Sequence, residues 1–133
     1  MANILIIDDE SDVRDSIAKV LTREGHAVLT AEGARSGLEI LAENQVDVLV
    51  TDIIMPGMDG VQAIRQVKTV KPEVKIVAIS GGGNFGLDSY QPNAITTTAF
   101  LQAAADAGAD RILTKPFERA ELIDCVASVL GSP

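Results

Sequence analysis

The chain has 133 residues, of which 47% are hydrophobic and 23% charged, which fits one globular domain over residues 1–133 and excludes a two-domain arrangement. Its 19 acidic residues against 11 basic ones give a net charge of -8, so no basic surface is left for binding nucleic acid through its phosphates. The single cysteine, Cys125, cannot form an internal disulfide, and no stretch offers the roughly 20 apolar residues of a membrane span or the pattern of a signal peptide, so we expect a cytoplasmic protein.

Short apolar runs alternate along the chain with segments whose apolar residues have helical spacing. In chain order the expected elements are a strand at Ile4–Ile7, a helix through Val13–Leu21, a strand at Ala27–Thr30, a helix through Ala34–Ala42, a strand at Val48–Thr51, a helix through Val61–Val67, a strand at Lys75–Ile79, a helix through Ala99–Ala107, a strand at Arg111–Leu113 and a helix through Leu122–Leu130. Strands that are apolar throughout are covered on both faces. The alternation therefore predicts an α/β fold, a single doubly wound sheet of parallel strands with helices on each side.

Residues that begin and end helices agree with these boundaries. Ser11 is expected to cap the first helix and Gly25 to end it, while Asp59-Gly60 opens the third and Gly108 closes the fourth. The connections are short except for residues 81–93, and a loop of that length in a compact domain is usually functional or mobile.

Polar residues follow the strands at the edge where ligands bind in an open parallel sheet. Asp8, Asp9 and Glu10 follow the first strand, Asp52 the third, Ser80 the fourth and Lys115 the fifth. Three carboxylates at one small site repel one another unless a cation neutralises them. Oxygen ligands without a nearby histidine or cysteine cluster favour Mg²⁺ over zinc or copper.

Such a site suits a phosphoryl group, whose negative charge is spread over its oxygens. An aspartate can accept the phosphoryl group as an acyl phosphate, and Asp52 is the best-placed candidate. Lys115 and Ser80 could each neutralise one phosphoryl oxygen beside the metal ion.

Together these residues resemble the receiver domain of two-component response regulators. The resemblance rests on Asp8-Asp9, on Asp52 followed by Met55-Pro56-Gly57-Met58-Asp59-Gly60, on Ser80, and on Lys115-Pro116-Phe117, in this order along nearly the whole chain. It implies a flavodoxin-like, five-stranded sheet of order 2-1-3-4-5 flanked by five helices. Because only three residues follow the expected last helix, we expect a stand-alone, single-domain regulator of the chemotaxis type, with no output domain.

The same resemblance implies a function. Asp52 would take a phosphoryl group from a phosphohistidine on a sensor histidine kinase or a phosphotransfer protein, so the chain would be a signalling protein that catalyses only its own phosphorylation and dephosphorylation. Asp9, Asp52 and the backbone carbonyl of Ile54 would bind Mg²⁺ directly, and Asp8 mostly through water. Lys115 would pair with the phosphoryl oxygens.

The signal would leave the site through Ser80, whose hydroxyl would move onto the phosphoryl group. That movement would bias a docking surface formed by the fourth helix and fifth strand toward an unidentified downstream protein. We expect the chain to act as a monomer.

Two features depart from the receiver pattern. Ile112 stands where receivers commonly carry an aromatic residue, so the signal is expected to pass mainly through the backbone after Ser80. The long loop begins at Gly81 and Gly82 and carries Phe85 and Tyr90, apolar residues that we expect to shape the choice of partner.

Other functions fit the sequence less well. A hydrolase of the haloacid dehalogenase type would carry its nucleophile in an Asp-x-Asp pattern on the first strand, where this chain has the adjacent pair Asp8-Asp9. A flavodoxin-like cofactor binder would need hydroxyls and bare amides in its first loop to hold a flavin phosphate, whereas the first loop of this chain is acidic. A receiver that is never phosphorylated usually lacks one of the acids, and here all are present. Whether the chain is a diffusible switch, a relay intermediate or a phosphate sink stays open.

Overall fold

The computed structural model describes residues 2–53, 60–80, 102–115 and 117–130. Its elements in chain order are β1 (Asn3–Ile7), α1 (Ser11–Arg23), β2 (Ala27–Ala31), α2 (Ala34–Glu43), β3 (Val48–Asp52), α3 (Gly60–Val70), β4 (Lys75–Ser80), β5 (Arg111–Thr114) and α5 (Arg119–Leu130). Residues 102–107, just before β5, are also helical and form the described part of the expected fourth helix.

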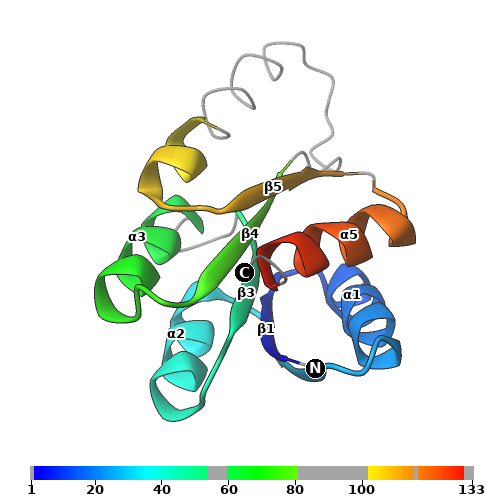
Figure 1. The fold of residues 1–133 in the computed structure, drawn as a ribbon. Helices are drawn as coiled ribbons and strands as arrows, with labels where there is room; N and C mark the ends of the chain where they lie inside the picture. The colour runs from blue at the N-terminus through cyan, green and yellow to red at the C-terminus, as the bar shows by residue number, and fades with distance from the viewer. Residues whose placement is uncertain (1, 54–59, 81–101, 116, 131–133) are drawn as a thin grey trace.

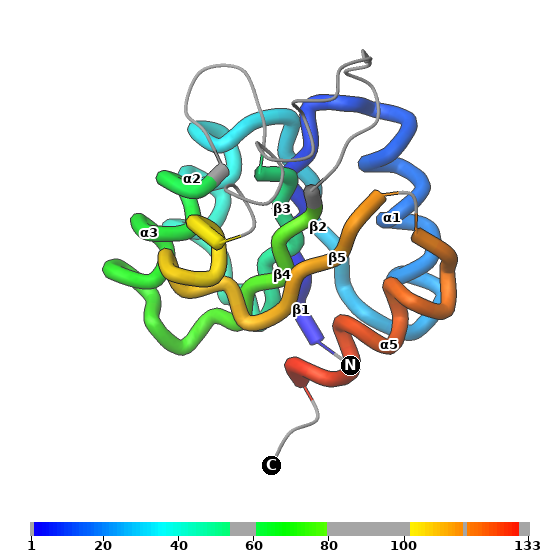
Figure 2. Tube along the Cα trace, turned by 90° about the horizontal axis from the view of Figure 1, so that it is seen from above, coloured from blue at the N-terminus to red at the C-terminus, as the bar shows by residue number. Residues whose placement is uncertain are grey.

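The five strands form one parallel sheet in the order β2-β1-β3-β4-β5 (Figures 1 and 2). This confirms the fold class and the strand order expected from the sequence. The strands also end in register, because Ile7 pairs with Thr51 and Asp52 pairs with Ile79. The residues that follow β1, β3 and β5 therefore emerge at the same edge of the sheet.

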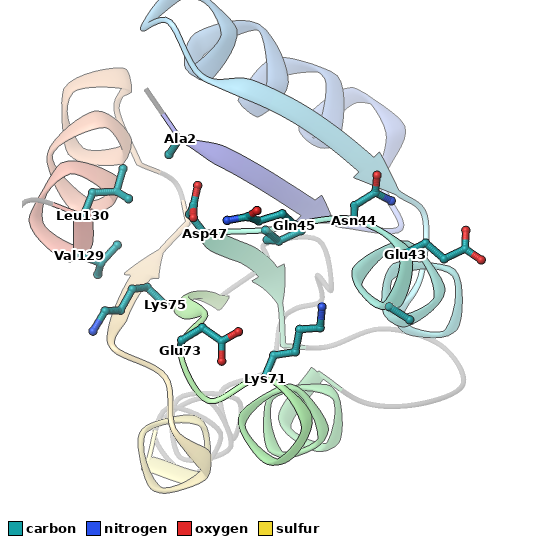
Figure 3. A pocket seen from close by; sticks show the side chains of 12 residues that line it. Ala2, Glu43, Asn44, Gln45, Asp47, Lys71, Glu73, Lys75, Val129 and Leu130 are labelled. Carbon is teal, nitrogen blue, oxygen red and sulfur yellow. The ribbon is translucent and has the colours of Figure 1, made fainter.

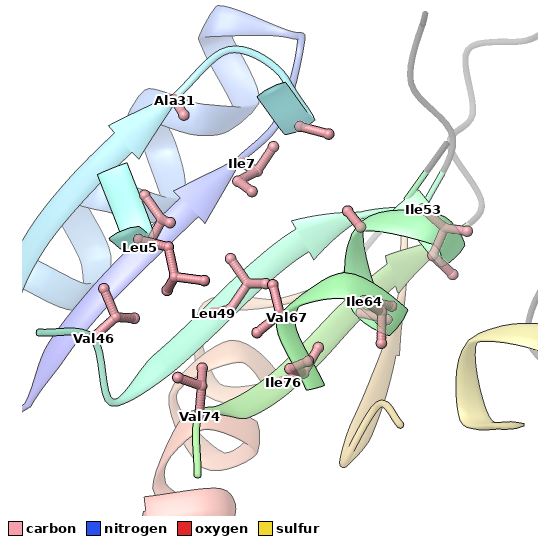
Figure 4. Close-up of a cluster of buried hydrophobic side chains, with 14 of the residues drawn as sticks. Leu5, Ile7, Ala31, Val46, Leu49, Ile53, Ile64, Val67, Val74 and Ile76 are labelled. Carbon is pink, nitrogen blue, oxygen red and sulfur yellow. The ribbon is translucent and has the colours of Figure 1, made fainter. Parts of the chain in front are cut away.

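Each face of the sheet carries its own hydrophobic core. Helices α2 and α3 cover one face, where side chains such as Leu5, Leu49 and Ile76 are fully buried (Figure 4). Helices α1 and α5 cover the other, around Ile6 and Val50 (Figure 1). Successive strand residues point to opposite faces, so a strand buried on both must be apolar throughout. In the described part of the chain, no helix is both long and apolar enough to cross a membrane.

The boundaries differ from the sequence prediction in small ways. Strands β3, β4 and β5 extend one residue further than predicted, to Asp52, Ser80 and Thr114, because parallel pairing continues into these polar residues. The prediction that Ser11 caps α1 is wrong: Glu10 occupies the N-cap position, without a capping hydrogen bond from its side chain, and Ser11 is the first residue of the helix. Gly25 follows the end of α1 with a positive φ of 94°, as a helix-ending glycine does.

Candidate functional site

The carboxyl edge of the sheet brings three acids and one lysine together. Asp8 and Asp9 follow β1, and Asp52 ends the neighbouring strand β3. Each of these aspartates offers a carboxylate oxygen, and the three oxygens lie within 4.8 Å of one another. Lys115 follows β5, two strands away from β3, but its long side chain spans the distance and its Nζ lies 3.6 Å from Oδ2 of Asp52.

Asp8 is held firmly by backbone contacts. Its amide donates to the carbonyl of Ala31, and its own carbonyl accepts a 2.8 Å hydrogen bond from Nη1 of Arg14. Its Oδ1 accepts a 2.9 Å hydrogen bond from the amide of Glu10. The other carboxylate oxygen, Oδ2, is buried and has no hydrogen-bond partner within the described residues.

The environment of Asp8 disfavours its charged form. Burial raises the pKa of the Asp8 carboxyl, and the hydrogen bond from Glu10 and the charge of Lys115 offset this only in part. An ionised, buried carboxylate oxygen without a hydrogen-bond donor costs free energy, so Oδ2 of Asp8 would be stabilised by a further donor or a cation.

Lys115 supplies one positive charge to this cluster. Its Nζ lies 3.2 Å from Oε1 of Glu10 and 3.7 Å from Oδ2 of Asp8, in addition to its contact with Asp52. Burial lowers the pKa of Lys115, but the charges of Asp52 and Asp8 and the hydrogen bond to Glu10 outweigh burial, so the pKa lies above its ordinary value. The ammonium therefore stays charged at neutral pH.

The donor set fits a hard divalent cation. All three clustered ligand groups are carboxylates, and the orphaned Oδ2 of Asp8 supplies an oxygen that an ion would satisfy. The chain's one histidine, His26, precedes β2 at the opposite edge, where its Nδ1 accepts a hydrogen bond from the amide of Ala2. A site of oxygen ligands without imidazole or thiolate favours Mg²⁺ or Ca²⁺ over zinc.

The structure describes only some of the remaining predicted site residues. Ser80 ends β4, where its backbone pairs with Thr114, but its side chain is not described. Ile112 is half-buried and packs against the core on the α2 and α3 face. The other five predicted site residues lie outside the described residues; they are Ile54, Gly81, Gly82, Phe85 and Tyr90.

Two residues at the site were given no role in the sequence analysis, although Glu10 was expected at this edge. Glu10 contacts Lys115, and Arg14 reaches back from the first turn of α1 to the carbonyl of Asp8. The signal for Glu10 was its position directly after Asp9, which extends the acidic run. Arg14 gave no comparable signal, because its contact depends on how α1 leaves the strand edge.

Cys125 carries no chemistry at this site. It is buried beside Leu122 and Val129 in the core between α1, α5 and the sheet. Burial raises the pKa of its thiol, although nearby Arg111 opposes the shift, so the thiol stays protonated and unreactive.

A pocket lies at the opposite, amino-terminal edge of the sheet. It has a volume of about 760 Å³ and contains both lysines and acids, among them Lys71, Glu73 and Lys75 (Figure 3). Asp47, which also lines the pocket, accepts a 2.8 Å hydrogen bond from the amide of Asn3 and so serves the chain's own backbone. None of the predicted site residues lines this pocket.

Comparisons with known proteins agree with the arrangement at the carboxyl edge. A family model described as the response regulator receiver domain matches residues 4–127. The response regulator receiver protein CpdR of Brucella abortus is 31% identical over 130 residues, which cover 98% of each chain. The crystal structure of the receiver domain of NtrX from Brucella abortus has 31% identity and a TM-score of 0.82, covering 98% of this chain and 99% of that one.

Several curated relatives are much longer. The DNA-binding transcriptional regulator NtrC of Azospirillum brasilense is 32% identical over 131 residues, which are 98% of this chain but 24% of that protein. The response regulator MprA of Mycolicibacterium vanbaalenii is 31% identical, and the match covers 49% of its length. The chain thus spans about a quarter to a half of these relatives and nearly all of CpdR.

Proposed function

The chain belongs to the response regulator receiver family, and we propose that Asp52 accepts a phosphoryl group from a phosphohistidine on a sensor histidine kinase or a phosphotransfer protein. One observation carries this proposal: the Asp52 carboxylate lies in a cluster with two further aspartates and the Lys115 ammonium. In the transfer, an Asp52 oxygen forms a bond to phosphorus while the P–N bond of the donor breaks and the imidazole leaves.

Asp8, Asp9, Asp52 and the backbone carbonyl of Ile54 would hold Mg²⁺, Asp8 mostly through water. When bound, the ion supplies positive charge that offsets both the acids and the phosphoryl oxygens. Oδ2 of Asp8 supports this assignment, since it is a buried acceptor that receives no hydrogen bond from the described residues and has only the Lys115 ammonium nearby, at 3.7 Å.

Lys115 would bind a phosphoryl oxygen directly. Its Nζ lies 3.6 Å from Oδ2 of Asp52, and its charged state supports a role in neutralising the transferred group. Ser80, at the end of β4, would place its hydroxyl on another phosphoryl oxygen.

We propose that output follows through the surface of the fourth helix and β5, including Ile112. The long loop with Gly81, Gly82, Phe85 and Tyr90 would shape the choice of a downstream protein, and the chain would act as a monomer.

Incubation with acetyl phosphate and Mg²⁺ tests the function. We expect intact mass to show one phosphoryl group per chain, absent when EDTA is present and removed by hydroxylamine, which cleaves acyl phosphates but not phosphoserine. As a control, the protein is incubated with p-nitrophenyl phosphate, where we expect no sustained release of phosphate. No adduct on the parent chain, or steady turnover of the monoester, would contradict the proposal.

Lys115 should compete with Mg²⁺ for the acids. Its Nζ lies within 3.7 Å of carboxylate oxygens of both Asp8 and Asp52, so Lys115→Met should tighten Mg²⁺ binding roughly tenfold. Isothermal titration with Mg²⁺ measures the effect. The control is Lys75→Met, which removes an exposed lysine at the opposite edge and should leave the affinity unchanged. Equal affinities for the parent and Lys115→Met would argue against direct competition.

A further inference from the structure

Among the described residues, the shortest contact of Lys115 is with an acid outside the group of three aspartates. Its Nζ lies 3.2 Å from Oε1 of Glu10, compared with 3.6 Å from Asp52 and 3.7 Å from Asp8. We propose that Glu10 is a positioning residue that holds the Lys115 ammonium before phosphoryl transfer and competes with the phosphoryl group for it. This inference rests on the proposed function of Asp52 and Lys115.

The backbone fixes the place from which Glu10 acts. Its amide donates to Oδ1 of Asp8, and its carbonyl accepts a hydrogen bond from the amide of Arg14 in the first turn of α1. Glu10 occupies the N-cap position of α1, but its side chain makes no capping hydrogen bond. The side chain instead crosses to Lys115 after β5, a residue 105 positions away in the sequence.

The three acids around Lys115 differ in how easily they release it. The Glu10 side chain is 41% exposed, whereas those of Asp8 and Asp52 are 1% and 10% exposed. Water can replace the ammonium at Glu10 but scarcely at the two buried aspartates. When a phosphoryl oxygen needs one of the three N–H donors of the ammonium, the Glu10 contact is therefore the one that breaks at least cost.

The competition predicts a gain in rate when Glu10 is changed. An ion pair of this exposure shifts an equilibrium only modestly, so Glu10→Gln should raise the initial rate of phosphorylation by acetyl phosphate roughly two- to fivefold. Glu10→Asp keeps the charge but shortens the side chain, so it should lose the contact and raise the rate by a similar factor.

The matched control is Asp12→Asn. Asp12 is an exposed acid two residues further along α1, and its replacement removes the same charge without touching the described ion pairs of Lys115. Its rate should equal that of the parent at moderate ionic strength. Urea unfolding of every variant checks that the fold is intact.

The experiment measures adduct formation by intact mass in the full chain with fixed Mg²⁺ and acetyl phosphate. A second measurement, the ¹⁵N chemical shift of Lys115 Nζ without phosphodonor, should change in Glu10→Gln and Glu10→Asp but not in Asp12→Asn. A merely structural role for Glu10 would leave that resonance in place.

Two kinds of failure can be told apart. If the parent is phosphorylated on Asp52 but both Glu10 variants react at the parent's rate, the inference is overturned and the proposed function stands. It is equally overturned if Glu10→Gln and Asp12→Asn are accelerated alike, since charge alone then accounts for the gain. If the parent forms no adduct, the proposed function fails and the inference fails with it.

Discussion

Asp52→Asn should abolish the phosphoryl adduct that acetyl phosphate and Mg²⁺ form on the parent chain. A carboxamide oxygen is a far weaker nucleophile than a carboxylate and yields no stable acyl phosphate, so the initial rate should fall at least about a hundredfold. The substitution also removes one of the three clustered carboxylates, which weakens the cation site. Intact mass over a time course, with both proteins at equal concentration, measures the loss.

Asp15→Asn is the control for this loss. Asp15 is an exposed residue of α1, so its substitution removes one negative charge without altering the acidic cluster. It should be phosphorylated at the rate of the parent. An equal adduct on Asp52→Asn would mean that another residue accepts the phosphoryl group, and peptide mapping after borohydride reduction would then locate it.

The fold could be predicted because burial on both faces leaves a strong sequence signal. Strand β3 is buried at every residue from Val48 to Asp52, so it reads as a continuous apolar run until its last two positions. The prediction ends β3, β4 and β5 one residue early because it follows the apolar run alone. Asp52, Ser80 and Thr114 are polar and so end the apolar runs in the sequence, although the backbone pairing continues through them.

The central acids could be predicted because parallel topology alone brings them to one edge. The pairing register of β1 and β3 then sets which of these residues are adjacent. Ile7 pairs with Thr51, so the residues after each, Asp8 and Asp52, must be neighbours. The contacts of Glu10 and Arg14 depend instead on side-chain conformation and on where α1 begins. The predicted cap at Ser11 places the start of α1 one residue too late, so the sequence analysis does not identify Glu10 as the N-cap residue.

Asp8→Asn should stabilise the protein without Mg²⁺, and adding Mg²⁺ should shrink this advantage over the parent. Asp8 is fully buried and its Oδ2 has no hydrogen-bond partner within the described residues. At neutral pH and with EDTA, removing this buried charge should raise the free energy of unfolding by about 1–3 kcal/mol. With Mg²⁺ at ten times its dissociation constant, the parent should gain about 1.4 kcal/mol, and the variant much less because it has lost a carboxylate of the site.

The pH dependence of unfolding provides an independent check that Asp8→Asn stabilises the protein without Mg²⁺. Burial raises the pKa of Asp8 in the folded protein above its ordinary 3.8, so the folded state holds the proton more tightly than the unfolded state does. The stability that protonated Asp8 contributes to the parent is therefore fully present below pH 3.8. It is lost as the pH rises through the raised pKa of Asp8 in the folded protein. Urea unfolding in EDTA should therefore show the advantage of Asp8→Asn shrinking as the pH is lowered, while Asp124→Asn, an exposed change on α5, shows no such trend. If the parent were the more stable protein in EDTA at neutral pH, the contacts of Asp8 with Glu10 and Lys115 would outweigh its burial, and the orphaned oxygen could no longer be taken as support for a cation site.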